Sequence, residues 1–456
     1  MSATDRSAAA TQHPLPAQGA ASAPPVRPDA RRPRSRPRVR HPGRRWGWGR
    51  RLLLLPVILA LLTLALLAAA VQWTPLVARS ETIAPEAVAE AKRLLRHNDP
   101  RRLQNGDVRT AEIPAALIDE GINYLASRRL HGRGAFAMAE DSAEVRLTLA
   151  VPLGATAAYL NFRATVREAA GEPRIAAASI GDLRLPAALA EGLLEMALVR
   201  FGVAEQWQNA RQAVRQISFE PASGLVGVTY VWESGLFDRA RTLAFTPAEI
   251  AEIKAAHLAL AGLLDHYAPG SRVLLAQVLP SLLNAVEPAP RARRAALLVL
   301  ASQLAEKNLA LLIPAARQWP RIRWLKLTLQ GRHDSAQHFV VSAALAAWAG
   351  EPAANAIGLY KEIDDSRGGS GFSFADLAAD RAGTLFGERL IGRSSQLDAA
   401  LAGPLTDADL LPSLSAFPEG FSAAEFKAQF GDRDSPAYRR LNDEIERRLA
   451  ELPLYR

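Results

Sequence analysis

The chain has 456 residues, of which 49% are hydrophobic and 22% are charged, and its formal net charge is +9. It contains no cysteine, which excludes disulfide bonds, thiol catalysis, thiolate metal sites and cysteine lipidation. The first 51 residues carry 12 arginines against two aspartates, a charge of +10, so the other 405 residues sum to −1. We therefore expect no nucleic-acid partner, because the basic charge does not belong to the folded part.

Residues 1–51 form a tail rich in arginine and proline, with eight prolines and few large apolar side chains. Such a segment buries too little apolar surface to offset its ordering entropy, so we predict a disordered cytoplasmic tail. Its arginines suit contact with anionic lipids of the inner leaflet, and a docking arm for a cytoplasmic partner is the alternative.

The run from Leu52 to Val71 holds 20 residues without a charge. A helix of that length spans about 30 Å, the thickness of the hydrocarbon core. Arginines gather before the run, so we predict a single transmembrane helix at 52–72, in a bacterial inner membrane, with a cytoplasmic N-terminus and a periplasmic C-terminal bulk. A cleavable signal peptide with small residues at Ala68 and Ala70 is the competing interpretation, and the length of tail and run favours an uncleaved anchor.

An α+β module is predicted at 111–245, after a helical stem at 73–110 in which Pro85 begins a helix. Another helix is expected from Pro114. Val145, Leu147 and Leu149 alternate with more polar residues, which is typical of a half-buried strand. Similar patterns predict strands at 159–166, 174–183, 213–219 and 227–232, and helices at 186–201 and 203–213. We expect a small antiparallel sheet.

Three segments of this module carry a family resemblance: Val151-Pro-Leu-Gly154, Tyr159-Leu-Asn161 and Ile180-Gly-Asp-Leu-Arg-Leu-Pro186. Their pattern over residues 145–201 resembles that of small membrane-anchored YpmS-type envelope proteins. The resemblance implies a curved sheet with a helix against it, a shape suited to lipid-like ligands, and it transfers no catalytic residue.

From residue 246 the pattern becomes mostly α-helical. Thr246 and Glu249 form a capping-box sequence with proline between them, and helices are predicted at 247–267, 272–286 and 290–307 within a module at 246–330. A second helical module is predicted at 331–390 and a peripheral segment at 391–456. The overall fold class is therefore α+β, with a helical C-terminal part.

The module at 331–390 has three predicted helices: 335–348 with Asp334 as N-cap, 352–363, and one capped by Ser373 that runs to residue 386. A polar loop is expected at 364–371. On the third helix Asp376, Asp380, Gly383 and Gly387 share one face. Because glycine costs helix propensity, the two glycines indicate a close helix contact.

Two carboxylates four residues apart on a helix repel each other unless a cation, a metal or a proton lies between them. Candidate metal ligands are His338, Asp376 and Asp380, and candidate catalytic carboxylates are Glu362, Asp365 and Asp376. No cofactor is established, and a divalent metal is possible. The alternative is a polar network that fixes helix packing. The candidate cationic partners of the carboxylates are His338, Lys361, Arg367 and Arg381.

The segment Gln337-His338-Phe339, with the later Phe372-Ser-Phe-x-Asp376-Leu-x-Ala-Asp380-x-x-Gly383, resembles a pattern of YfiM-type lipoproteins and VanZ-like membrane proteins. The resemblance covers residues 331–388 and implies an envelope role. The chain has no cysteine to carry a lipid, so a membrane-spanning helix would have to replace the lipid anchor.

Together these patterns predict a membrane-anchored cell-envelope protein that binds an envelope partner or a lipid-like ligand on the exported side. An envelope hydrolase acting on peptidoglycan or another glycan, or a metal-binding protein that uses 331–388, is the alternative.

Overall fold

The structure is a computed structural model that describes residues 47–99, 103–153, 156–169, 172–200, 204–233, 245–367 and 369–456. The predicted disordered tail lies outside the described residues up to position 46. The chain divides into two compact units, residues 1–60 and residues 61–456.

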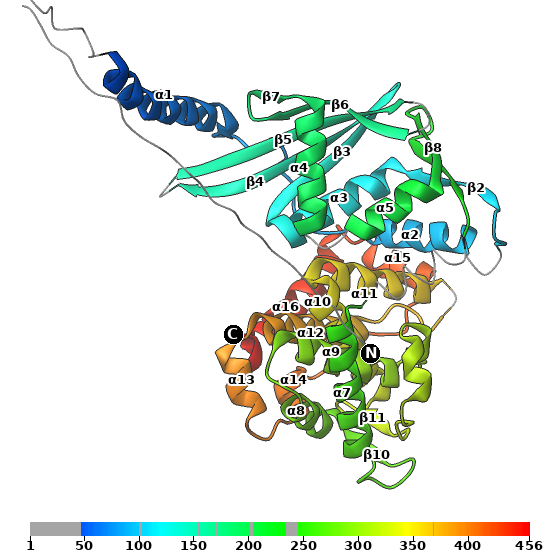
Figure 1. Ribbon diagram of the computed structural model, residues 1–456. Coiled ribbons are helices and arrows are strands. Elements are labelled where there is room, and N and C mark those ends of the chain that lie inside the picture. Colours follow the sequence, from blue (N-terminus) through cyan, green and yellow to red (C-terminus); the bar gives the residue numbers. More distant parts are fainter. Residues whose placement is uncertain are drawn as a thin grey trace, which may run out of the picture. The chain divides into compact units, whose positions relative to one another are not determined.

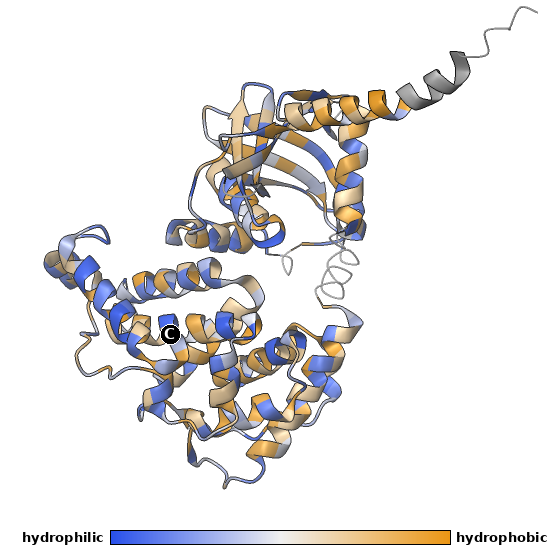
Figure 2. Cartoon of the chain, turned by 90° about the vertical axis from the view of Figure 1, so that its left-hand side faces the viewer, coloured by the Kyte–Doolittle hydropathy of each residue, from blue (hydrophilic) through white to orange (hydrophobic). Residues whose placement is uncertain are grey.

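Helix α1 (Gly47–Ala70) contains the uncharged run. Its large apolar side chains from Leu55 onward are exposed, and the described part of the helix is hydrophobic over most of its length (Figure 2). Within the described part of the chain, no helix is both long and apolar enough to cross a membrane. The transmembrane helix predicted at 52–72 is therefore not supported by the structure.

The α+β part contains a six-stranded antiparallel sheet in the order β3-β4-β5-β6-β7, with β1 paired to β5. This confirms the predicted antiparallel sheet. Strand β3 is an addition to the predicted strands, because Gly132 and Gly134 indicate a break when the sequence is taken alone. A Cβ at Gly134 would lie 2.8 Å from Cγ2 of Ile122, so the glycine lets helix α3 (Ala115–Leu130) pack closely on this strand. The strands are β1 (Val71–Gln72), β3 (Gly132–Ala139), β4 (Ser142–Leu153), β5 (Thr156–Ala169), β6 (Glu172–Ile180) and β7 (Leu183–Leu185).

A smaller antiparallel sheet has the order β2-β9-β8. Helix α3 contacts β3, and α4 contacts β6 (Figure 1). The helices lie where the sequence predicts them, whereas the sequence pattern does not predict β2. The elements are α2 (Pro85–His97), β2 (Val108–Pro114), α3 (Ala115–Leu130), α4 (Ala187–Arg200), α5 (Ala204–Ala213), β8 (Val214–Glu220) and β9 (Leu225–Val231).

The C-terminal part is mostly helical, as predicted, and is built around one continuous hydrophobic core. Residues 391–456, expected to be peripheral, contribute Leu410, Ile445 and Tyr455 to this core. The short strands β10 (Arg272–Leu274) and β11 (Lys326–Thr328) pair in parallel. The helices are α7 (Pro247–Leu264), α8 (Leu275–Ala285), α9 (Pro290–Leu304), α10 (His333–Ala349), α11 (Glu351–Ser366), α12 (Phe374–Gly392), α13 (Ser395–Leu401), α14 (Asp407–Leu410), α15 (Ala423–Phe430) and α16 (Pro436–Glu451).

Helix ends test the capping predictions directly. The capping box at Thr246 forms, and the hydroxyl of Ser373 accepts a hydrogen bond from the Asp376 N–H at 3.0 Å, so both caps are confirmed. The prediction that Asp334 caps α10 is wrong, because the helix begins at His333 and the Asp334 carboxylate pairs with Arg332 at 2.7 Å. The predicted loop at 364–371 is also partly wrong, since α11 continues to residue 366.

Helices α10 and α12 touch backbone to backbone. A Cβ on Gly383 would lie 2.0 Å from the carbonyl oxygen of Phe339, and a Cβ on Gly387 would lie 2.2 Å from that of Ala343. Real Cβ atoms do not approach an oxygen so closely, so the contact exists only because both positions are glycine. The close helix contact indicated by the sequence is present, and it presses Asp380, one turn earlier, against α10.

Replacement of Gly383 by alanine should force the two helices apart. We expect Gly383→Ala to lower the free energy of unfolding by about 3 kcal/mol or more, since the clash is with backbone that has no room to move. Urea unfolding of the full chain measures this. Gly392→Ala in the same helix is the matched control: its Cβ would meet nothing within 4 Å, so the change should stay within about 1 kcal/mol. A Gly383→Ala protein as stable as that control would contradict the prediction.

Candidate functional site

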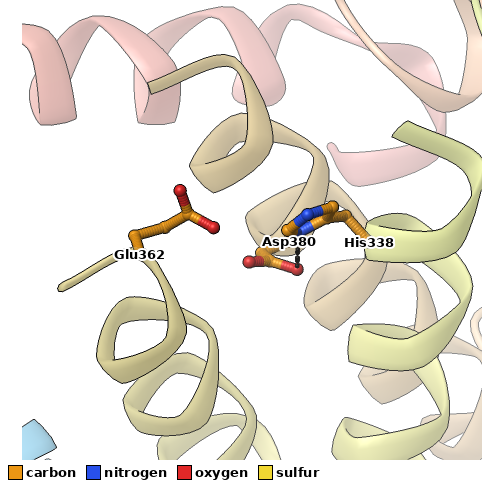
Figure 3. Close-up of side chains that lie close together, drawn as sticks. All are labelled: His338, Glu362 and Asp380. Carbon is orange, nitrogen blue, oxygen red and sulfur yellow. Dashed lines mark hydrogen bonds and ion pairs between the residues drawn. The ribbon is translucent and has the colours of Figure 1, made fainter. Parts of the chain in front are cut away.

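Three helices bring one histidine and two carboxylates together. His338 lies on α10, Glu362 on α11 and Asp380 on α12, and their side chains point toward one another (Figure 3). One ligand atom from each residue lies within 4.8 Å of the other two, and all three residues are buried. This cluster is the candidate functional site.

Asp380 is held by α10 through one of its two oxygens. Its Oδ1 lies 3.1 Å from Nδ1 of His338 and accepts a hydrogen bond from the Ser342 hydroxyl at 2.7 Å. Its Oδ2 is buried and has no hydrogen-bond partner among the described residues. A Cβ on Gly358 of α11 would lie 2.9 Å from this oxygen. A buried carboxylate oxygen without a donor is costly, and a bound ion is one partner that would relieve that cost.

Lys361 supplies the positive charge of the cluster. Its Nζ lies 3.2 Å from Nε2 of His338, 3.4 Å from Oε1 of Glu362 and 2.8 Å from Oδ2 of Asp365. An ammonium group can only donate hydrogen bonds, so this contact is a hydrogen bond only while Nε2 of His338 carries no proton. The imidazole proton then lies on Nδ1, which donates to Asp380. This chain of contacts runs from the half-exposed lysine to the buried aspartate.

The charge state of His338 depends on two opposed sets of neighbours. Burial lowers its pKa, but the carboxylates of Asp380 and Asp376 outweigh burial and raise the pKa to about 9, while Lys361 works against them. A protonated His338 would point an N–H at the Lys361 ammonium. A proton on Nε2 would therefore break the hydrogen bond that Lys361 donates to this nitrogen over 3.2 Å.

Glu362 is fully buried, and burial raises its pKa to about 7, although the charge of Lys361 opposes the change. Its Oε2 accepts a hydrogen bond from the backbone N–H of Ser373 at 3.0 Å, which fixes the carboxyl group at the start of α12. The proton occupancy of Glu362 therefore changes near neutral pH.

The remaining predicted site residues lie around the cluster. Oδ2 of Asp376 lies 3.8 Å from Nε2 of His338 and its Oδ1 lies 3.7 Å from Arg332, so this carboxylate borders the cluster. Burial also raises the pKa of Asp376. Asp365 pairs with Lys361 on the outer side. Among the metal candidates the structure thus joins His338 and Asp380, and it adds Glu362 as the third buried ligand.

Two of the predicted cationic partners do not join the cluster. Arg381 turns to Glu446 at 2.6 Å and to Glu351 at 2.9 Å. Among the described residues, Arg367 forms no ion pair with Asp376 or Asp380. Sequence reasoning missed the part played by Gly358, and a glycine in the middle of a helix is the signal that could have found it.

A small cavity of about 150 Å³ reaches the cluster from one side. Its walls include Val341, Leu345 and Ile357, and its polar end includes His338, Lys361 and Asp380. The three residues predicted to be catalytic, Glu362, Asp365 and Asp376, do not line it. A small molecule in this cavity would therefore meet the histidine, the lysine and Asp380.

Comparisons of the chain with protein-family models, with curated proteins and with solved structures found no significant match. The resemblances to YpmS-type, YfiM-type and VanZ-like proteins therefore stay predictions.

Glu362→Gln tests the charge state of the buried carboxyl group, and it keeps an oxygen that can accept from Ser373. Because the folded-state pKa of Glu362 is raised to about 7, the stability that the carboxyl group contributes is complete below its unfolded pKa of 4.5 and is lost as the pH rises through 7. Relative to wild type, the variant should gain stability between pH 5 and pH 8, on the order of 3 kcal/mol at the upper end. Urea unfolding in EDTA across this range measures the difference. A stability difference that does not change with pH would contradict the raised pKa.

Proposed function

We propose that the helical C-terminal part binds one divalent cation between His338, Glu362 and Asp380. The observation that supports the proposal is the convergence of three buried ligand atoms from three helices within 4.8 Å of one another. Lys361 offsets part of the cost of burying these ionisable groups, and a divalent cation between them would offset more of it.

The ligand set favours a transition metal. One imidazole nitrogen with two carboxylate oxygens suits Zn²⁺ or Mn²⁺ better than Ca²⁺, which prefers six to eight oxygens. Bonds of 2.0–2.2 Å in tetrahedral geometry place ligand atoms about 3.4 Å apart, so the three side chains would tighten on binding. The second oxygen of Glu362 and one oxygen of Asp380 are already held by Ser373 and Ser342, which orients both carboxylates.

The cavity supports a centre that admits a small ligand. Three protein ligands leave a fourth position on a tetrahedral ion, and the 150 Å³ cavity reaches two of these ligands. Catalysis of glycan hydrolysis by Glu362 with Asp365 or Asp376 is less well supported. Glu362 is fully buried, and an acid–base pair for glycan cleavage must face a cleft.

Lys361 would compete with the ion, because its ammonium lies within 3.4 Å of two of the three ligand residues. In a metal-binding site, Lys361→Met removes a repulsive charge and tightens binding. In a purely structural network, the same substitution leaves the buried carboxylates without their counter-charge and lowers stability, with no effect of metal.

Titration calorimetry of the full chain with Zn²⁺, Mn²⁺ and Mg²⁺, together with thermal unfolding in metal or EDTA, tests the proposal. We expect one ion per chain, and stabilisation of about 2.7 kcal/mol when the metal is at 100 times its Kd. Asp380→Asn should weaken binding about a hundredfold or more, and Lys361→Met should tighten it about tenfold. Asp365→Asn is the control, because this carboxylate contacts Lys361 but lies outside the ligand set. No metal effect on the wild-type protein, or equal losses in Asp380→Asn and Asp365→Asn, would contradict the proposal.

We also propose, from the sequence pattern, that residues 52–72 anchor the chain in a bacterial inner membrane and export the rest, where it meets an envelope protein or a lipid-like ligand. The exposed apolar side chains of α1, such as Leu55 and Leu64, support an apolar environment for this helix. Alkaline phosphatase fused after residue 456 should be active only if the C-terminus is exported, and the chain should resist carbonate extraction from membranes. A fusion inactive in intact cells, or a chain released by carbonate, would contradict the proposal.

A further inference from the structure

A second cavity, of about 340 Å³, lies in the helical C-terminal part, between α7, α9 and the segment that joins α9 to β11. This segment contains two short 3₁₀ turns, Leu309–Leu311 and Pro314–Gln318. The cavity contains none of the residues of the metal cluster. Its volume falls in the range of small-molecule sites, which is about 300–1,000 Å³.

The charged residues that line this cavity are all positive. Lys307, Arg317 and Arg321 line it, and no aspartate or glutamate does. All three cationic side chains are exposed, and none forms an ion pair within the described part of the chain. Ser302, Gln303 and Asn308 add neutral hydrogen-bonding groups to the lining, in an arrangement that suits an anion.

His257 forms part of the wall and is only 8% exposed. Its Nε2 lies 2.6 Å from the carbonyl oxygen of Pro320, which can only accept, so Nε2 carries a proton. Its Nδ1 is buried and has no hydrogen-bond partner among the described residues. The ring meets Trp319 edge to face, with centroids 5.2 Å apart. The ring therefore forms a fixed, aromatic part of the cavity wall beside Trp319.

We propose that this cavity binds a small organic anion, with a phosphate or carboxylate group held by Lys307, Arg317 and Arg321. A planar ring of the ligand packs against Trp319, where aromatic contact adds affinity without a directional requirement. This binding activity is separate from the metal centre and does not depend on it.

Calorimetry on the full chain in low-salt buffer with EDTA tests the proposal with two anionic probes, adenosine 5′-monophosphate and indole-3-carboxylate. Their neutral counterparts are adenosine and indole. At least one anionic probe should bind at least tenfold more tightly than its neutral counterpart, and the preferred probe tells phosphate from carboxylate. The double variant Arg317→Ala with Arg321→Ala should weaken binding about a hundredfold, roughly tenfold for each lost charged hydrogen bond.

The control is the double variant Arg272→Ala with Arg291→Ala, which removes the same charge from exposed positions outside the cavity. It should bind as wild type does, and so should Asp380→Asn, which separates this cavity from the metal centre. The proposal is overturned if neither anionic probe binds at millimolar concentration, if the neutral probes bind equally well, or if the control variant loses as much affinity as the double variant in the cavity.

Discussion

The contact between α10 and α12 sets the geometry of the helical C-terminal part. Gly383 and Gly387 let the two backbones touch, and the rings of Phe339 and Phe386 pack beside that contact with centroids 5.5 Å apart. Asp380 lies one helical turn before the first glycine, so the same contact that closes the core also carries a carboxylate into it. Stability and site geometry are therefore properties of one helix interface, and a change in helix separation would alter both.

The free-energy cost of burying charged groups explains why each side chain of the cluster has a polar partner. Each partner relieves part of the desolvation of another: a backbone N–H for Glu362, a hydroxyl for Asp380, an ammonium for the outer carboxylates. Each buried oxygen that such a network leaves without a partner costs free energy. Oδ2 of Asp380 and Oδ1 of Asp376 are two such oxygens at the cluster.

Local sequence signals predict local features of this chain well. The caps at Thr246 and Ser373 follow from hydroxyl groups that precede helices, and the spacing of Gly383 and Gly387 is enough to indicate the close helix contact. The choice of Glu362 over Asp376 depends on how α11 packs across α12, and spacing along the chain does not encode that packing. Strand β3 escapes prediction for a related reason: its glycines allow close packing, of Gly132 on strand β4 and of Gly134 on helix α3, and in isolation they signal a turn. Asp334 misleads because a nearby arginine competes for its carboxylate.

Gly358 has a consequence for which residues this centre tolerates. The Asp380 carboxylate packs against α11 because position 358 has no side chain: a Cβ there would lie 2.9 Å from Oδ2 and 3.2 Å from Cγ of Asp380. Any side chain at position 358 would therefore displace Asp380 or move α11 away from α12. The three helices thus define a signature, His-x₃-Ser, then Gly-x₂-Lys-Glu, then Asp-x₂-Gly, which begins at His338, Gly358 and Asp380. Each of the three patterns contains a residue whose side chain, or lack of one, the geometry of the cluster requires.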